Sequence, residues 1–247
     1  MVGSESTTRL LIVLPAYNEA TGIGAVLADL RRHVPGADVV VVDDGSSDET
    51  TTVARGAGAT VLRLPFNLGI GGALQTGYLF AYENSYDIAV QFDADGQHKA
   101  EEIPDLIQPI LDGEANHVIG SRLMGKGAYR FPLMRRAGSW LIRFVTFLVT
   151  GRRIHDPTSG SRASGRRALA FFARHYPQAY LDSPQITVWM LRQGMRVAEV
   201  PVEMNEAEHS SIGSVRGVLH SLRVCVALVI DRIEAPFSEP MDKEASA

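Results

Sequence analysis

Residues 87–98 read Asp-Ile-Ala-Val-Gln-Phe-Asp-Ala-Asp-Gly-Gln-His and lead from a short apolar run to two carboxylates, Asp93 and Asp95. Alternate residues of an extended chain point to the same side, so both carboxylates lie on one face where the strand ends. Such a pair holds Mg²⁺ or Mn²⁺ together with ligand phosphates, and Gln97 adds a neutral oxygen at the next alternate position. The stretch therefore predicts a metal site at a strand end, with an ordinary polar turn as the alternative.

The bulk properties are those of one large α/β domain. At 247 residues the chain can bury a sizeable core. Its single cysteine, Cys225, excludes an intrachain disulfide and fits a reducing compartment. We see no signal peptide and no run of about 20 apolar residues, and so expect a cytoplasmic protein. The expected organisation is a flexible N-terminus, one domain, an amphipathic helix and a disordered tail, over residues 1–8, 9–212, 213–234 and 235–247.

Short β-rich runs alternate with helical patterns in the first half of the chain. Strands are predicted at 10–14, 39–42, 60–64, 88–92 and 117–120, with helices at 18–33, 48–56, 68–83 and 104–111. Asn18 is the expected N-cap of the first helix, and Ser46 or Ser47 that of the second. In the second half, helices are predicted at 133–150, 166–175, 183–193 and 215–233, and a strand at 197–202. The alternation predicts a doubly wound, Rossmann-like, mostly parallel sheet flanked by helices.

Ligands of such a sheet bind beyond the carboxyl ends of its strands. The residues that follow the predicted strands are all polar or glycine-rich, and we expect them to converge on one edge: 15–19, 43–46, 67–69, 93–95 and 121–122. Asp44 could accept from a nucleobase or bind a ribose, and Tyr17 could stack on the base. Asn67 and Gly69 open a helix whose backbone amides can approach a phosphate closely. The alternative for Asp44 is a plain strand-to-helix turn.

Neither of the common glycine-rich nucleotide motifs is present. The segment 67–72 lacks the Lys-Ser/Thr ending of a P-loop and the G-x-G-x-x-G spacing of a dinucleotide fold. The sequence therefore argues against a kinase, an ATPase and a dehydrogenase.

The charge of the chain is unevenly distributed. The window 122–167 holds eleven basic residues and one acid, Asp156, and so carries +10, whereas the whole chain carries −4. This asymmetry predicts an anionic partner, with a solvated charged face as the alternative. A divalent cation at Asp93 and Asp95 could neutralise a departing nucleoside diphosphate, while arginines of the window hold a second anion.

Seven motifs, taken together and in this order, resemble glycosyltransferase family 2, and within it the dolichol-phosphate mannose synthase-like branch of polyprenyl-phosphate hexosyltransferases. They are PAYNE (15–19), VVDDGSSDET (41–50), NLGIGGALQTGY (67–78), FDADGQH (92–98), GSR (120–122), R-R-x-x-S (135–139) and DPTSGSR (156–162). The resemblance implies a GT-A fold. It also implies inverting, metal-dependent transfer of a hexose from a GDP- or UDP-sugar to dolichyl or undecaprenyl phosphate.

The resemblance also implies roles for individual residues. Nucleotide-binding positions are Pro15, Tyr17, Glu19 and Asp44. The residues that follow the predicted strands add Asn67, Gly69 and Asp93 as further candidates. Metal positions are Asp93, Asp95 and Gln97, and acceptor-phosphate positions are Arg122, Arg135, Ser139 and Arg162. Catalytic candidates are Asp95, Arg122 and Asp156. Since a phosphate acceptor needs no general base, no catalytic histidine is expected, and His98 is predicted to orient a neighbour or close the site.

Two features depart from the family pattern. Many members carry C-terminal transmembrane helices, which this chain lacks, and Ser161 stands where an aromatic residue is common. The apolar helix around 139–149 and the amphipathic helix at 215–233 could lie in a lipid interface, or could pack on the core, on a second copy or on a membrane-protein partner.

The leading hypothesis is a peripheral membrane enzyme that transfers a hexose to a polyprenyl phosphate, and two other functions compete with it. One is a soluble glycosyltransferase of cell-envelope glycan synthesis with a sugar or polysaccharide acceptor, for which Asp156 would be the carboxylate base. The other is a non-enzymatic nucleotide- or nucleic-acid-binding protein that uses the basic window. We expect no nucleic-acid partner, because the window has few aromatic residues placed for base stacking.

Overall fold

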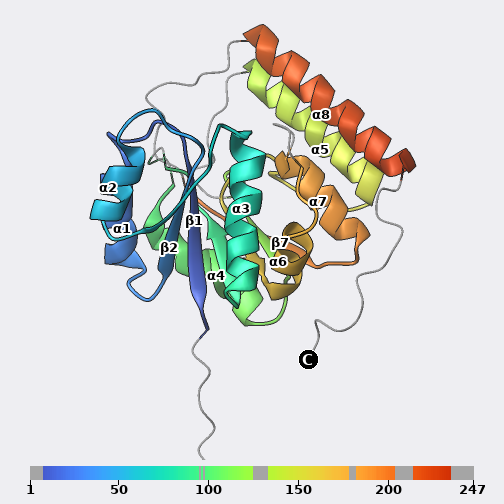
Figure 1. The fold of residues 1–247 in the computed structure, drawn as a ribbon. Coiled ribbons are helices and arrows are strands. Elements are labelled where there is room, and N and C mark those ends of the chain that lie inside the picture. Colours follow the sequence, from blue (N-terminus) through green and yellow to red (C-terminus); the bar gives the residue numbers. More distant parts are fainter. Residues whose placement is uncertain are drawn as a thin grey trace, which may run out of the picture.

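A seven-stranded sheet forms the centre of the molecule (Figure 1). The computed structural model describes residues 8–94, 96, 98–124, 133–177, 182–203 and 214–234, without the side chains of 133–136, 182, 214–218, 220, 233 and 234. The strands, in chain order, are β1 (Leu10–Ala16), β2 (Asp38–Asp43), β3 (Thr60–Arg63), β4 (Ile88–Gln91), β5 (His117–Ser121), β6 (Arg162–Gly165) and β7 (Val197–Pro201). Their spatial order is β3-β2-β1-β4-β6-β5-β7, and all but β6 run in one direction. The predicted mostly parallel sheet is confirmed.

Helices cover both faces of the sheet. They are α1 (Ile23–His33), α2 (Thr50–Gly56), α3 (Gly69–Glu83), the 3₁₀ turn η1 (Ala100–Glu102), α4 (Ile103–Leu111), α5 (Leu133–Thr150), α6 (Arg166–Phe172), α7 (Asp182–Arg192) and α8 (Ser214–Glu234). In β1, Leu10, Ile12 and Leu14 pack against α1, while Leu11 and Val13 face the layer of α3, α6 and α7. Because successive strand residues point to opposite faces, an all-apolar strand is the expected solution for a sheet buried on both sides.

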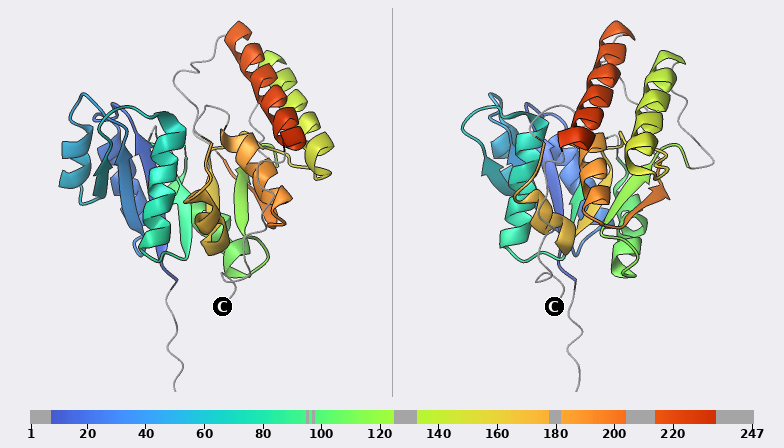
Figure 2. Two further views of the ribbon diagram at one scale, coloured as in Figure 1. Left: turned by 45° about the vertical axis from the view of Figure 1, so that its right-hand side comes forward. Right: turned by 90° about the vertical axis from the view of Figure 1, so that its right-hand side faces the viewer.

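The helices α5 and α8 lie side by side and extend away from the sheet (Figure 2). Together with α7 they enclose a separate apolar cluster that contains Ile142, Val224 and Leu228. Where they meet, a Cβ added to Gly138 would lie 2.5 Å from the hydroxyl oxygen of Ser221, so a side chain at this position would require that hydroxyl to move. The sequence predicted both helices, but not that they pair with each other.

Besides the short 3₁₀ turn η1, the sequence analysis missed strand β6. It consists of Arg-Ala-Ser-Gly, lies antiparallel between β4 and β5, and is buried throughout. Its residues carry no apolar run or alternation, so a local pattern predicts only the turn that precedes it. The burial of β6 comes from the strands on either side and from α4 and α6, which contact it.

Two helix starts differ from the prediction. Helix α1 begins at Ile23 after Gly22, because Asn18 has a φ of +57° and its side-chain oxygen accepts from the Ser47 amide instead of capping the helix. Helix α2 begins at Thr50, and the hydroxyl of Ser46 accepts from the Asn18 amide. These polar residues tie the segment after β1 to the segment after β2. The other predicted elements are confirmed to within a few residues at each end.

Candidate functional site

The segments that follow the parallel strands meet at one edge of the sheet. Ala16 stands opposite Asp43 in the register of β1 and β2, and the amide of Asp44 donates to the carbonyl of Ala16 over 2.9 Å. On the other side of β1, the amide of Phe92 donates to the carbonyl of Val13 over 3.0 Å. The predicted convergence of the polar strand ends is confirmed for the described residues.

Asp44 connects the end of β2 to the start of α3. Its carboxylate accepts from the amides of Leu68 and Gly69, over 2.7 and 2.9 Å, and the residue is almost fully buried. Gly45 follows with a φ of +75°, and a Cβ there would lie 2.8 Å from the backbone of Phe66, so a side chain would displace the 66–69 loop. The nucleotide-binding role of Asp44 stays a prediction, while Tyr17 and Asn67 are exposed at the same edge.

Asp93 lies at the end of β4 with 30% of its side chain exposed. Its Oδ2 atom lies 3.0 Å from Nε2 of His98, so His98 orients it, the first of the two roles expected for that histidine. Burial raises the pKa of Asp93, but the charge and hydrogen bond of His98, a hydrogen bond from Gln91 and the charge of Arg122 outweigh burial and lower it overall. Asp93 therefore presents an ionised carboxylate.

The turn before β6 lies directly against this carboxylate. A Cβ added to Gly160 would stand 2.8 Å from Oδ2 of Asp93. On the other side, a Cβ added to Gly22 would stand 3.7 Å from the carbonyl oxygen of Ala94 and 3.9 Å from a carboxylate oxygen of Glu19. The loop after β4 thus runs between the start of α1 and the turn at Gly160, and brings Glu19 and Asp93 into the same region.

The residues of this loop suit a divalent cation in part. A partly exposed, ionised carboxylate at a strand end is a donor that Mg²⁺ and Mn²⁺ accept. Asp95 and Gln97, the other predicted ligands, lie outside the described residues. Within the described part of the chain, no group of three or more His, Cys, Asp or Glu side chains could hold a metal ion. The metal site therefore stays a prediction, with Asp93 in a suitable position.

Arg122, just past β5, forms a two-pronged ion pair with Asp156. Its Nε donates to Oδ2 of Asp156 over 2.7 Å and its Nη2 to Oδ1 over 2.8 Å, while Thr158 contacts both side chains. Asp156 is fully buried. Both oxygens of Asp156 are thus engaged, an arrangement that favours a positioning role over that of a general base.

Arg162 occupies the interior instead of the edge. The residue is 1% exposed, and its guanidinium donates to the carbonyls of Pro157 and Ser159, each over 2.8 Å, and to the hydroxyl of Thr187 over 3.3 Å. These contacts hold the turn at 156–161 against α7. The prediction of a phosphate contact at Arg162 is not tested, but this geometry gives the side chain a structural role.

The other two predicted acceptor residues lie on α5. Ser139 is half-buried on that helix. The side chain of Arg135 lies outside the described residues, so its direction is not part of the site as described. The grouping of Arg122, Arg135 and Ser139 around a phosphate therefore stays a prediction.

The basic window does not form a single surface. Arg122 lies at the carboxyl edge of the sheet, whereas Arg162 is interior. Because β6 runs antiparallel, Arg166 and Arg167 come at the opposite edge, where they donate to the carbonyls of Tyr86 and Gln193. An anion at the candidate site can therefore meet only part of the +10 charge.

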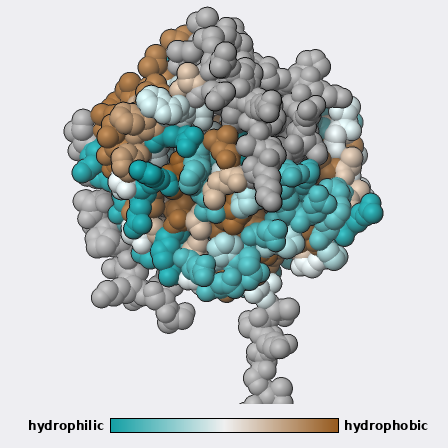
Figure 3. Space-filling view, turned by 180° about the vertical axis from the view of Figure 1, so that it is seen from behind, coloured by the Kyte–Doolittle hydropathy of each residue, from teal (hydrophilic) through white to brown (hydrophobic). Residues whose placement is uncertain are grey.

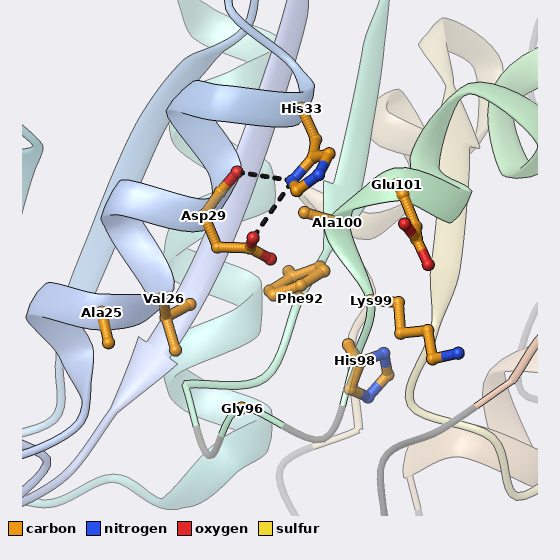
Figure 4. A pocket seen from close by; sticks show the side chains of 10 residues that line it. All are labelled: Ala25, Val26, Asp29, His33, Phe92, Gly96, His98, Lys99, Ala100 and Glu101. Atoms are coloured by element: carbon orange, nitrogen blue, oxygen red, sulfur yellow. Dashed lines mark hydrogen bonds and ion pairs between the residues drawn. The ribbon is translucent and has the colours of Figure 1, made fainter.

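A cavity of about 400 Å³ adjoins the site between α1 and the segment after β4 (Figure 4). Its lining includes His98, whose Nε2 atom lies 3.0 Å from Oδ2 of Asp93. Three of its lining residues have partners, since His33 contacts Asp29 over 3.0 Å and Lys99 pairs with Glu203 over 2.7 Å. The cavity extends the candidate site but adds no unpartnered charge of its own at these positions.

Glu199 and Thr158 both contact the Arg122–Asp156 region, and sequence reasoning singled out neither. The amide of Asp156 donates to Glu199 over 2.8 Å, although the two residues are 43 positions apart. A lone glutamate in a strand carries no local pattern that reveals such a contact. Only the spacing of the DPTSGSR motif could have drawn attention to Thr158.

Comparison with known proteins agrees with this geometry. A family model described as glycosyl transferase family 2 matches residues 11–171. The chain is 34% identical over 209 residues to the undecaprenyl-phosphate mannosyltransferase of Micrococcus luteus, covering 81% of this chain and 85% of that protein. It is 30% identical over 220 residues to the UDP-N-acetylglucosamine–dolichyl-phosphate N-acetylglucosaminyltransferase of Methanococcus voltae, covering 81% of this chain and 87% of that protein.

The fold has a counterpart among solved structures. Glucosyl-3-phosphoglycerate synthase from Mycobacterium tuberculosis, in complex with Mn²⁺, UDP and phosphoglyceric acid, matches with a TM-score of 0.73 and 23% identity. The match covers 94% of this chain and 81% of that one, and shows that the fold is GT-A. With the family model matching well over half of its length, the chain is a glycosyltransferase that belongs to glycosyl transferase family 2.

Proposed function

We propose that the protein transfers a hexose from a GDP- or UDP-sugar to a polyprenyl phosphate, with inversion at the sugar carbon. The observation that carries the proposal is that an ionised carboxylate, Asp93, and an arginine held by an ion pair with Asp156, Arg122, lie at one edge of the sheet. The relatives from Micrococcus luteus and Methanococcus voltae are named for undecaprenyl and dolichyl phosphate acceptors, which supports the acceptor class.

On the donor side, we assign the nucleotide to the ends of β1 and β2. Tyr17 is exposed there and can stack on the base, and Pro15 and Glu19 lie in the same segment. Asn67 and Gly69 follow β3, and the Gly69 amide donates to Asp44 at the end of β2. Asp93 would hold a divalent cation, Mg²⁺ or Mn²⁺, with Asp95 and Gln97. A bound cation would neutralise the charge that develops on the departing diphosphate.

On the acceptor side, we assign the phosphate to Arg122, with Arg135 and Ser139 from α5. One phosphate oxygen forms the new bond to the anomeric carbon, while the bond from that carbon to the nucleoside diphosphate breaks and its electron pair leaves with the diphosphate. Because the acceptor oxygen is already anionic, no proton has to be removed. Asp156 holds the guanidinium of Arg122 in one orientation while this occurs.

The rival proposal is a soluble enzyme with a hydroxyl acceptor and Asp156 as the base. A general base must reach the proton that it removes, directly or through one water. Asp156 is fully buried and accepts from Arg122 with both oxygens. We therefore favour the phosphate acceptor.

We also propose that the enzyme is peripheral to the membrane at its cytoplasmic face, and binds lipid through α5 and α8. Apolar side chains gather over this part of the molecule (Figure 3). The exposed ones recur at helical spacing: Trp140, Phe144, Phe147 and Leu148 on α5, and Leu219, Leu222, Val226, Val229 and Ile230 on α8. Exposed Arg152, Arg153, Arg223 and Arg232 accompany them. No helix in the described part of the chain is long and apolar enough to cross a membrane.

Donor binding can be tested by thermal unfolding in the presence of nucleotide. A nucleoside diphosphate at 100 times its dissociation constant should stabilise the folded state by about 2.7 kcal/mol. We expect a clear rise in Tm with UDP or GDP plus Mn²⁺ or Mg²⁺, and a smaller one with EDTA. Adenosine diphosphate serves as the control nucleotide. The absence of a metal-dependent shift with any nucleoside diphosphate or nucleotide sugar would refute the proposed function.

Membrane binding can be tested by co-sedimentation with vesicles that contain anionic lipid. We expect the wild type to sediment at low salt, and the Trp140→Glu/Leu148→Glu variant to stay in the supernatant, because both side chains are more than 60% exposed on α5. Leu111→Glu on α4, which also replaces an exposed leucine, is the matched control and should still sediment. A wild type that ignores vesicles but is dimeric, with the double variant monomeric, would assign the surface to a second copy instead.

A further inference from the structure

Glu199, in the middle of β7, makes four contacts with the loop that leads to Asp156. The amide of His155 lies 2.9 and 2.8 Å from its two carboxylate oxygens, and the amide of Asp156 donates to Oε1 over 2.8 Å. Nδ1 of His155 lies 2.8 Å from Oε2. The glutamate side chain is 7% exposed, so these contacts replace the hydration that the carboxylate has lost.

The loop that Glu199 holds carries the ion pair of the candidate site. Glu199 stands opposite Ile119 in the register of β5 and β7, three residues before Arg122. Asp156, whose amide Glu199 binds, accepts from Nε and Nη2 of Arg122 over 2.7 and 2.8 Å and also accepts weakly from the Arg122 amide. An unbroken series of contacts therefore runs from β7 through Asp156 to the guanidinium of Arg122.

We propose that Glu199 is a positioning residue for Arg122: by fixing the backbone of Asp156, it sets the direction in which the guanidinium meets the acceptor phosphate. This inference rests on the proposed function, in which Arg122 binds that phosphate. Glu199 itself lies behind Asp156 and is not assigned a contact with substrate.

The chemistry of the position supports this role. At a nearly buried position in a strand, an apolar side chain would cost less free energy than a carboxylate, which is costly to bury unless it is fully hydrogen-bonded. The benefit of the carboxylate is geometric: two oxygens accept from successive amides, which fixes the 155–156 peptide in one orientation. Loss of such a support moves the residues that depend on it, and displacement of a binding group by about 1 Å can cost about 100-fold in rate.

The test measures acceptor and donor binding separately, by calorimetry, with farnesyl phosphate as a short polyprenyl monophosphate and UDP or GDP as the nucleotide. We expect Glu199→Ala to weaken farnesyl phosphate binding by about tenfold or more while nucleotide affinity changes less than twofold. Glu199→Gln keeps one acceptor oxygen, so its affinity for farnesyl phosphate should lie between those of the wild type and Glu199→Ala. Glu114→Ala, at an exposed position before β5, is the control and should bind both ligands as the wild type does.

Combining Glu199→Gln with Arg122→Ala distinguishes a role in positioning Arg122 from a purely structural role of Glu199. If Glu199 acts through Arg122, Glu199→Gln should not weaken farnesyl phosphate binding further in an Arg122→Ala background, so the two effects will not add. Additive effects, or a folded Glu199→Gln or Glu199→Ala protein that binds farnesyl phosphate normally, would overturn the inference and leave the proposed function standing. A wild type that binds nucleotide but not farnesyl phosphate would overturn the proposed acceptor instead, and the inference with it.

Discussion

Replacing Asp93 by asparagine is expected to lower the rate of sugar transfer by about 100- to 1,000-fold, the usual cost of removing one group that stabilises charge in a transition state. Asparagine keeps the size of the side chain and one oxygen but removes the negative charge that attracts a divalent cation. The same variant should lose most of the metal-dependent rise in Tm with nucleoside diphosphate, measured relative to its own ligand-free Tm.

The matched control for this prediction is Asp105→Asn on α4, which removes the same charge at an exposed position. It should leave turnover and the nucleotide-induced shift unchanged. If Asp93→Asn transferred sugar at the wild-type rate at the Mg²⁺ or Mn²⁺ concentration that just saturates the wild type, Asp93 would not be a metal ligand, and the donor half of the proposed mechanism would be wrong. Full rescue only at high metal concentration would instead support weakened metal binding.

Much of the sheet could be predicted because its strands are buried on both faces. Continuous apolar runs such as Val39–Val42 have few other uses in a chain of this length, and the polar residues after them mark the edge where ligands bind. That reasoning led to Asp44, Asp93 and Arg122, which the structure brings to a common edge. In this fold, then, the place of the candidate site follows from the topology once the strands are known.

The contacts that hold those residues could not be predicted, because they join distant positions. Asn18 looks like a helix cap in sequence, but its best partner is the amide of Ser47, 29 residues away. Arg162 matches a basic motif, yet the carbonyls of Pro157 and Ser159 draw it into the interior. Strand β6 is buried by its neighbours and not by its own composition. Local patterns report which elements form, whereas side-chain partners depend on the assembled fold.

Replacing Asp156 by alanine is expected to lower the free energy of unfolding by about 3–5 kcal/mol, the usual cost of breaking a buried ion pair from one side. The side chain of Arg122 is 11% exposed and that of Asp156 is not exposed, so the guanidinium would be left without its main counter-charge. Urea denaturation measures the change. The double variant Arg122→Ala/Asp156→Ala should recover part of the loss, because it removes the uncompensated charge as well.

The same residue separates the two acceptor hypotheses when it is replaced by asparagine. If Asp156 positions Arg122, Asp156→Asn should raise KM for a polyprenyl phosphate and reduce stability, since an amide accepts from the guanidinium with only one oxygen. If Asp156 were the base for a hydroxyl acceptor, KM would stay close to that of the wild type while kcat collapsed; the loss of stability is expected in both cases, because the ion pair with Arg122 is broken either way. Because the contact with Arg122 is buried and two-pronged, we expect the raised KM. A collapse of kcat at unchanged KM would instead support a sugar acceptor.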